Sequence, residues 1–287
     1  MEPILVTGAT GAQGGAVTRA LLARGHRVRA LTRTPHGVAA RELRRLGADV
    51  AHGDFGDPAS LRAALHGVRA VFAVTTPFGS DTDAETRHGI ALVDAARDVE
   101  HIVFTSASNA DRGTGVPHFD SKRRIEEHLV AAGPRWTVLG PSAFIDDKFG
   151  DWTLRGLREG TFHLPVPSDR ELHLVAVRDI ADVAVLALEQ PDRFADRRLD
   201  LAGEALTPAD MAAALTAAIG HPVRHHCPPL DVVARYSTDL AAMFGYFTEV
   251  GTDIDLGRLH AELPEITWLR YADFVRLLPW PELLRPA

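Results

Sequence analysis

The residues Ile4-Leu5-Val6-Thr7-Gly8-Ala9-Thr10-Gly11-Ala12-Gln13-Gly14 decide the fold class of this chain. A short apolar run ends in a G-x-x-G-x-x-G loop, and an amphipathic stretch follows it. Strand, glycine loop and helix in this order are typical of a dinucleotide-binding βαβ unit, in which the helix N-terminus faces a pyrophosphate. In such a loop the first glycine permits a tight turn, the second a close approach of backbone to phosphate, and the third close packing of helix on strand. The pattern therefore predicts cofactor-binding residues at Gly8, Thr10, Gly11, Ala12, Gln13 and Gly14.

Short apolar runs alternate with longer amphipathic runs up to about residue 140, which is the order expected of a doubly wound parallel sheet. We expect strands at Ile4–Thr7, Arg27–Leu31, Ala48–Ala51, Ala70–Val74, His101–Thr105 and Trp136–Leu139. We expect helices at Ala12–Arg24, Val38–Leu46, Pro58–Leu65, Asp83–Asp98 and His118–Ala132.

After Pro141 the pattern becomes less regular, with helices expected at Thr207–Ile219, capped by Thr207, and near Leu230–Phe247. The prediction is an α/β protein. A Rossmann domain would occupy residues 1–150, and a smaller α+β lobe residues 151–287, with some segments of the lobe returning to the sheet.

The composition excludes several classes of protein. The 287 residues carry a net charge of −7, which disfavours nucleic acid as the main partner. No apolar run is long enough to span a membrane and no secretory leader is recognisable, so we expect a cytoplasmic protein. The single cysteine, Cys227, excludes an internal disulfide. A homodimer is left open.

The end of the second expected strand indicates which dinucleotide binds. NAD enzymes place an acid there to bind the ribose 2′-hydroxyl, whereas residues 3–41 of this chain contain six arginines and no acid. Arg33 is placed to pair with a 2′-phosphate, so NADP(H) is the predicted cofactor. Further cofactor contacts are expected after the third and fourth strands, at Asp54 and Phe55 and at Thr75, Thr76 and Pro77.

The helix expected after the fifth strand begins His118-Phe119-Asp120-Ser121-Lys122. Short-chain dehydrogenases carry Tyr-x-x-x-Lys at this place, so the lysine is present and a histidine replaces the tyrosine. We expect Lys122 to bind the nicotinamide ribose, and His118 to be either a general acid or only the start of the helix. Ser106, at the end of the fifth strand, is a candidate hydrogen-bond donor to a substrate carbonyl.

Together these motifs resemble the NmrA-like family of atypical short-chain dehydrogenases, in particular its NADPH-sensor branch. The matching stretches are Thr7–Gly14, Arg33-Thr34-Pro35, Gly53-Asp54, His118–Lys122, Pro141-Ser142-Ala143-Phe144 and Asp239–Phe244. The resemblance implies NADP(H) binding and places Pro141, Ala143 and Phe144 in a loop that crosses the nicotinamide. Some members of the family are reductases, whereas others bind the cofactor without turnover and report redox state to a partner protein.

Two functions therefore stay open. The first is an NADPH-dependent reductase that transfers hydride to a quinone, enone or iminium, acceptors that need no strong protein acid. Candidate contacts to a small flat apolar substrate are Phe149, Trp152, Phe162, Phe244, Tyr246 and Phe247. The second is a non-catalytic redox sensor that regulates a partner protein. No metal is expected, because the adjacent residues His225-His226-Cys227 would alternate faces on a strand and cannot all ligate one ion.

Overall fold

The structure is a computed structural model that describes residues 2–76, 81–146 and 150–285. The chain divides into two compact units. The first comprises Met1–Pro141 and Ile180–Asp200, and the second comprises Ser142–Asp179 and Leu201–Ala287.

A seven-stranded sheet forms the centre of the first unit, in the order β10-β6-β5-β4-β1-β2-β3. Its strands are β1 (Ile4–Val6), β2 (Val28–Thr32), β3 (Asp49–His52), β4 (Ala70–Val74), β5 (His101–Thr105), β6 (Arg135–Pro141) and β10 (Arg197–Leu201). From β3 to β6 every neighbouring pair is parallel. Strand order reverses between β1 and β4, and open sheets of this kind bind ligands at the carboxyl ends of the strands near that point.

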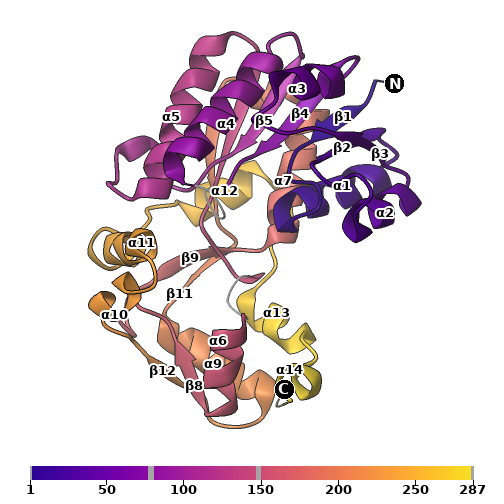
Figure 1. Cartoon of the computed structure of the whole chain (residues 1–287). Coiled ribbons are helices and arrows are strands. Elements are labelled where there is room, and N and C mark those ends of the chain that lie inside the picture. The colour runs from indigo at the N-terminus through magenta and orange to yellow at the C-terminus, as the bar shows by residue number, and fades with distance from the viewer. Residues whose placement is uncertain (1, 77–80, 147–149, 286–287) are drawn as a thin grey trace. The chain divides into compact units, whose positions relative to one another are not determined.

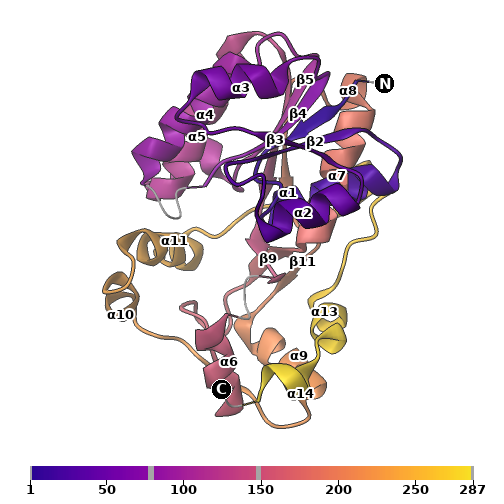
Figure 2. The same cartoon turned by 45° about the vertical axis from the view of Figure 1, so that its right-hand side comes forward.

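Helices cover both faces of this sheet (Figures 1 and 2). One face carries α3 (Pro58–Leu65), α4 (Thr82–Ala95) and α5 (Pro117–Ala132), and the other carries α1 (Ala12–Ala23), α2 (Val38–Arg45) and α7 (Val177–Glu189). A short turn of helix, α8 (Pro191–Phe194), precedes β10. Alternate strand residues such as Leu5, Val71 and Phe104 pack with Leu92 of α4 and Ile125 of α5 in one apolar core.

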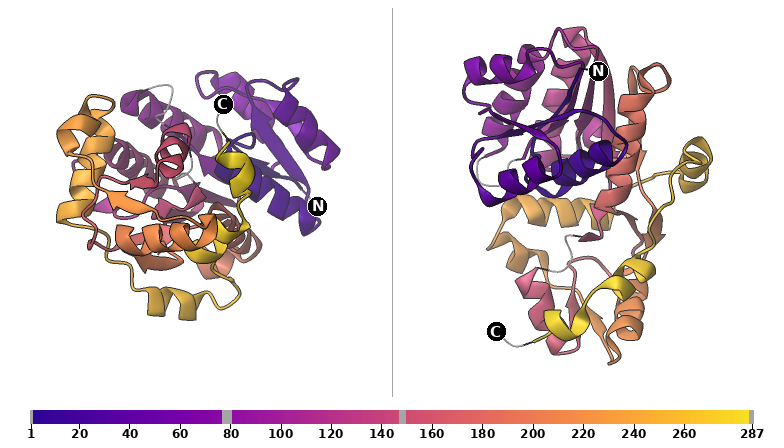
Figure 3. Two further views of the ribbon diagram at one scale, coloured as in Figure 1. Left: turned by 90° about the horizontal axis from the view of Figure 1, so that it is seen from below. Right: turned by 90° about the vertical axis from the view of Figure 1, so that its right-hand side faces the viewer.

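The second unit contains two small sheets, of order β11-β9-β7 and β12-β8. Their strands are β7 (Ala143–Phe144), β8 (Thr161–His163), β9 (Leu172–Val175), β11 (Glu204–Leu206) and β12 (Arg224–His226). The helices are α6 (Asp151–Arg158), α9 (Pro208–Ile219), α10 (Leu230–Ala234), α11 (Thr238–Glu249), α12 (Leu256–Glu262), α13 (Tyr271–Leu277) and α14 (Trp280–Leu283). Figure 3 shows these elements, coloured from magenta to yellow, from two further directions. Among the described residues, no helix has the length and apolarity needed to cross a bilayer.

The predicted α/β class with a doubly wound sheet is confirmed, and the predicted strands and first helices agree to within a few residues at each end. Thr207 caps α9 through a capping box with Asp210. Two details differ from expectation. The stretch near Leu230–Phe247 forms two helices, because the chain turns before Ser237, whose side chain caps α11. A seventh strand, β10, joins the sheet beside β6; a return of later segments to the sheet was expected, but no bounds were predicted for this strand.

Candidate functional site

The glycine loop between β1 and α1 has the geometry that its glycines predict. Gly8 has a φ of +58°, and a Cβ there would lie 2.5 Å from Cγ1 of Val74. A Cβ on Gly14 would lie 2.4 Å from the carbonyl oxygen of Gly8. Gly11 is the N-cap of α1, and no side chain among the described residues caps this helix. The loop can therefore approach an anion with its backbone N–H groups.

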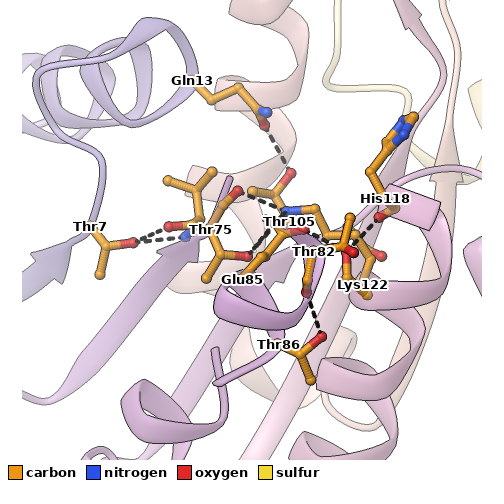
Figure 4. Close-up of polar contacts among 12 residues, drawn as sticks. Thr7, Gln13, Thr75, Thr82, Glu85, Thr86, Thr105, His118 and Lys122 are labelled. Atoms are coloured by element: carbon orange, nitrogen blue, oxygen red, sulfur yellow. Dashed lines mark hydrogen bonds and ion pairs between the residues drawn. The ribbon is translucent and has the colours of Figure 1, made fainter. Parts of the chain in front are cut away.

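Two polar side chains hold the loop against the neighbouring strands (Figure 4). The Thr7 hydroxyl donates to the carbonyl of Val74 at 2.9 Å and accepts from the N–H of Val74 at 2.7 Å. The Thr105 hydroxyl donates to Oε1 of Gln13 at 2.8 Å. These bonds connect the loop and the first turn of α1 to the carboxyl ends of β4 and β5.

Arg33 lies at the carboxyl end of β2 and is exposed. The loop that follows is held by two arginines of α2. Arg41 donates to the carbonyl of His36 at 2.5 Å, and Arg44 donates to the carbonyl of Pro35 at 2.6 Å. An exposed guanidinium next to a loop of fixed shape is suited to pairing with a phosphate.

Asp54 and Phe55 follow β3. The Asp54 carboxylate accepts a 2.8 Å bond from the N–H of Gly56, which shapes the turn and leaves its other oxygen for a further contact. Phe55 is half-buried, packs against the apolar core, and lies with its ring centroid 5.8 Å from that of His88. Much of its apolar surface therefore belongs to the core.

Lys122 is the centre of a buried polar network at the end of β4 (Figure 4). Its Nζ donates to the Thr75 carbonyl at 2.7 Å and to the Thr75 hydroxyl at 3.1 Å, and it lies 2.6 Å from Oε1 of Glu85. Glu85 also accepts from the Thr75 hydroxyl at 3.0 Å and from the Ser121 hydroxyl at 2.6 Å. The Lys122 side chain is 10% exposed and the Glu85 side chain 0% exposed. All three donors of the ammonium therefore have partners within the protein.

The packing of α4 against α5 brings this pair together. A Cβ on Gly89 of α4 would lie 2.4 Å from Cδ1 of Ile125 of α5, so the two helices approach closely there. Glu85 lies one turn before Gly89, and Lys122 lies one turn before Ile125. Glu85 was not predicted from the sequence. The sequence does contain a sign that Glu85 is buried, because the spacing i, i+4, i+7 places it on the same face of α4 as the buried Gly89 and Leu92.

His118 lies one turn before Lys122 on α5, as the spacing predicts, but its side chain takes another direction. Its carbonyl accepts from the Ser121 hydroxyl at 3.0 Å, and its ring meets the Phe119 ring edge-on at 4.6 Å. In Figure 4 the imidazole extends away from the network around Lys122.

Of the other residues predicted after β4, Thr76 is exposed, and Pro77 lies outside the described residues.

Ser106, at the end of β5, belongs to a second buried network. Its hydroxyl donates to Glu126 of α5, whose other oxygen accepts from Arg198 at 3.0 Å. Arg198 also donates to Asp200 and, at 2.7 Å, to the Ala107 carbonyl. Burial raises the pKa of both Glu126 and Asp200, whereas these two carboxylates raise the pKa of Arg198 against the effect of its burial. Glu126, Arg198 and Asp200 were not predicted from the sequence.

The remaining predicted residues are distributed between the units. Pro141 ends β6 and is buried in the first unit, whereas Ala143 and Phe144 form β7 of the second unit and pair with β9. Phe162 is fully buried and Phe247 nearly so, which indicates core packing, whereas Phe244 and Tyr246 of α11 are half-buried. Phe149 and the Trp152 side chain lie outside the described residues.

Comparison with known sequences gives long matches. A sequence model described as the NmrA-like family matches residues 1–274. The chain is 34% identical over 240 residues to an NAD(P)H azoreductase of Xenophilus azovorans, covering 83% of this chain and 81% of that protein. It is 31% identical over 247 residues, with 84% of each chain covered, to the (4-alkanoyl-5-oxo-2,5-dihydrofuran-3-yl)methyl phosphate reductase of Streptomyces griseus.

Solved structures show the same fold. A triphenylmethane reductase of Citrobacter sp. complexed with NADP(H) superposes with a TM-score of 0.82 at 21% identity, covering 96% of this chain and all (100%) of that one. NmrA, described as a negative transcriptional regulator in complex with NADP, superposes with a TM-score of 0.81 at 19% identity, covering 98% and 96% of the two chains.

Proposed function

The chain belongs to the NmrA-like family, and from that premise we propose that it is an NADP(H)-dependent reductase of a conjugated, apolar acceptor. One observation carries the proposal. The glycine loop after β1, Arg33 after β2 and Lys122 beside Thr75 after β4 all lie at the carboxyl edge of one parallel sheet. In doubly wound sheets this edge binds the dinucleotide.

The residues present fit NADP(H). Gly8 and Gly14 stand where a Cβ would collide with backbone or with Val74, and the start of α1 offers its N–H groups to a pyrophosphate. Arg33 would pair with the 2′-phosphate, and the absence of an acid from residues 3–41 removes the group that would repel it. Asp54 keeps one carboxylate oxygen for the adenine amine, and the half-buried Phe55 beside it offers apolar surface.

Lys122 is the proposed ligand of the nicotinamide ribose. The longest of its three contacts is the 3.1 Å bond to the Thr75 hydroxyl, which also donates to Glu85. Exchanging that one contact for a ribose hydroxyl would leave the ammonium paired with Glu85 and bonded to the Thr75 carbonyl. NADPH, when bound, supplies the hydride.

The proton donor cannot be the tyrosine of ordinary short-chain dehydrogenases, because all three tyrosines lie beyond residue 235. We assign the role to His118 or Ser106. Ser106 is bonded to Glu126, and burial raises the pKa of that carboxyl, so it keeps its proton to a higher pH than an exposed glutamate does. A conjugated acceptor makes little demand on either group, because it delocalises the charge that hydride transfer adds. The two reductases compared above support such an acceptor, since the azo group and the 5-oxo-2,5-dihydrofuran in their names are both conjugated.

The test is NADPH oxidation, followed at about 340 nm, with a panel of quinones, azo dyes and unsaturated lactones. We expect turnover with at least one class. Arg33→Ala should weaken NADPH binding about tenfold, the size of one charge-assisted contact at an exposed site. The matched control is Arg45→Ala, an exposed arginine in the last turn of α2, which should leave binding unchanged. Equal losses in the two variants would mean that Arg33 has no specific role.

The second candidate is a redox sensor that binds NADP(H) without turnover. Two observations favour it: the first unit has no tyrosine, and protein groups already bond every donor of Lys122. The structural similarity to a described regulator supports the fold alone. Tight NADPH binding with no oxidation across the whole panel would favour the sensor over the reductase.

A further inference from the structure

His226 of β12 meets a histidine from a distant part of the sequence. Strand β12 pairs in parallel with β8, and the register places His226 opposite His163. The two Nδ1 atoms lie 3.2 Å apart, and the ring centroids lie 5.1 Å apart with the planes 78° from parallel. Both strands belong to the second unit, so this arrangement is independent of the proposed cofactor site.

The surrounding backbone holds the pair in place. On one side of it the N–H of Arg224 bonds the carbonyl of Gly160 at 2.9 Å, and on the other the N–H of Leu164 bonds the carbonyl of His226 at 3.1 Å. The His163 ring lies over Gly156 of α6, where a Cβ would be 2.7 Å from its Cδ2. Glycine inside a helix is unfavourable by roughly 0.5–1 kcal/mol relative to alanine. At position 156 the glycine leaves room for the His163 ring.

We propose that Nδ1 of His163 and Nδ1 of His226 chelate a divalent transition-metal ion of the zinc class. Nitrogen ligands of zinc lie about 2.0–2.1 Å from the ion. Two such ligands 3.2 Å apart would subtend an angle of about 100–106° at the metal, close to the tetrahedral value. The separation of the two nitrogens is therefore that expected of two ligands of one ion.

The electrostatic surroundings suit a cation. A metal binds the neutral form of each imidazole through a lone pair on a ring nitrogen. The carboxylate of Glu159 also acts on His163 and would favour a positive ion nearby. No group of three or more metal-ligating side chains occurs among the residues that the structure describes. Solvent would fill the remaining coordination positions.

The neighbours that the sequence motif suggested are not part of this site. His225 lies on the other face of β12, and its Nε2 bonds the carbonyl of Leu164 at 2.9 Å. Cys227 lies beyond the end of the strand, outside the paired stretch that aligns His226 with His163. The alternation of faces along β12 excludes the motif itself as a ligand set and selects His163 as the partner of His226.

The test uses the full chain without a histidine tag, titrated with zinc chloride in an isothermal calorimeter at pH 7.5. We expect one zinc ion per chain. His163→Ala and His226→Ala should each weaken binding by about tenfold or more, because each removes one arm of the chelate. His225→Ala and Cys227→Ser are matched controls from the same segment and should bind zinc like the unchanged protein. Zinc should also slow hydrogen exchange in β8 and β12.

Two results would overturn the proposal. Absence of zinc binding in the unchanged protein would leave the two rings as a simple hydrogen-bonded pair. Binding that survives both alanine substitutions would place the ion at other histidines. Should His163→Ala fail to fold, anomalous scattering from a zinc-soaked crystal of the unchanged protein decides the question, since the ion must lie between the two Nδ1 atoms.

Discussion

Removing one charge of the Glu85–Lys122 pair should destabilise the first unit much more than removing both. The two side chains are almost completely excluded from solvent and lie 2.6 Å apart. Glu85→Gln leaves an ammonium in this site without its counter-charge, and Lys122→Met leaves the carboxylate in the same position. Breaking a buried pair in this way costs about 3–5 kcal/mol, and we expect the lower end because Thr75 and Ser121 still bond the remaining partner. Because neither charge is then left unpaired, the double variant should cost only about 1 kcal/mol, which is about 5 kcal/mol less than the sum of the single variants.

The assay is urea unfolding of the four proteins of this cycle, with hydrogen exchange measured on peptides from α4 and α5 so that the first unit is followed separately. A coupling free energy within about 0.5 kcal/mol of zero would refute the reasoning, because additive effects mean that the two charges do not depend on each other. NADPH titration of the same proteins gives a second measurement. If Lys122 binds the ribose, the double variant should regain stability without regaining affinity.

Three further predictions concern other parts of the first unit. Burial lowers the pKa of His101 to about 4, so the unfolded chain takes up a proton first as the pH falls below about 6.5, and stability should drop by about 1.4 kcal/mol at pH 5.5. His101→Gln should flatten that part of the urea unfolding profile, and an unchanged slope would contradict the assignment. Gly14→Ala places a Cβ 2.4 Å from the carbonyl oxygen of Gly8, so it should lower the free energy of unfolding by about 1–3 kcal/mol and also weaken NADPH binding. In the control Gly15→Ala the new Cβ lies 3.2 Å from its nearest neighbour, so both losses should be smaller. Equal losses in the two variants, measured by calorimetry, would rule out this steric explanation. Arg33→Asp should shift cofactor preference from NADPH toward NADH, measured as the ratio of dissociation constants, and a constant ratio would remove Arg33 from the 2′-phosphate site.

Local patterns predicted most of the first unit. The central strands of the sheet are short apolar runs between glycines and polar turns, and such runs can be recognised in the sequence. In the structure β4 and β5 have the predicted bounds. Strand β10 was missed because Arg197-Arg198-Leu199-Asp200-Leu201 has no such run, and its place beside β6 depends on tertiary pairing. The break before Ser237 was missed because residues 230–247 keep a helical composition through the turn.

The residues of the candidate site that are required by backbone conformation could be predicted from the sequence. Pairs of side chains that are far apart in the sequence were harder to predict. The spacing of the glycines was sufficient for the loop, because Gly8 and Gly14 are required by the backbone itself. Lys122 was found as half of a motif, but its partner Glu85 is 37 residues away and is selected by the contact of two helices. Arg198, which balances Glu126, is farther still along the chain. Such pairs cannot be predicted from a single sequence unless it is known which helix faces contact each other.

The division of the first unit into two stretches of chain affects how the protein can fold during synthesis. Residues 180–200 complete this unit, so the polypeptide must pass through the whole of Ser142–Asp179 before the sheet can close. Before β10 is synthesised, Glu126 lacks its ion pair with Arg198. A fragment that ends near residue 150 would contain the glycine loop, Arg33 and Lys122 and would still lack the strand that completes their sheet. The unit that contains the seven-stranded sheet is therefore not a module that can be cut out at a single point in the chain.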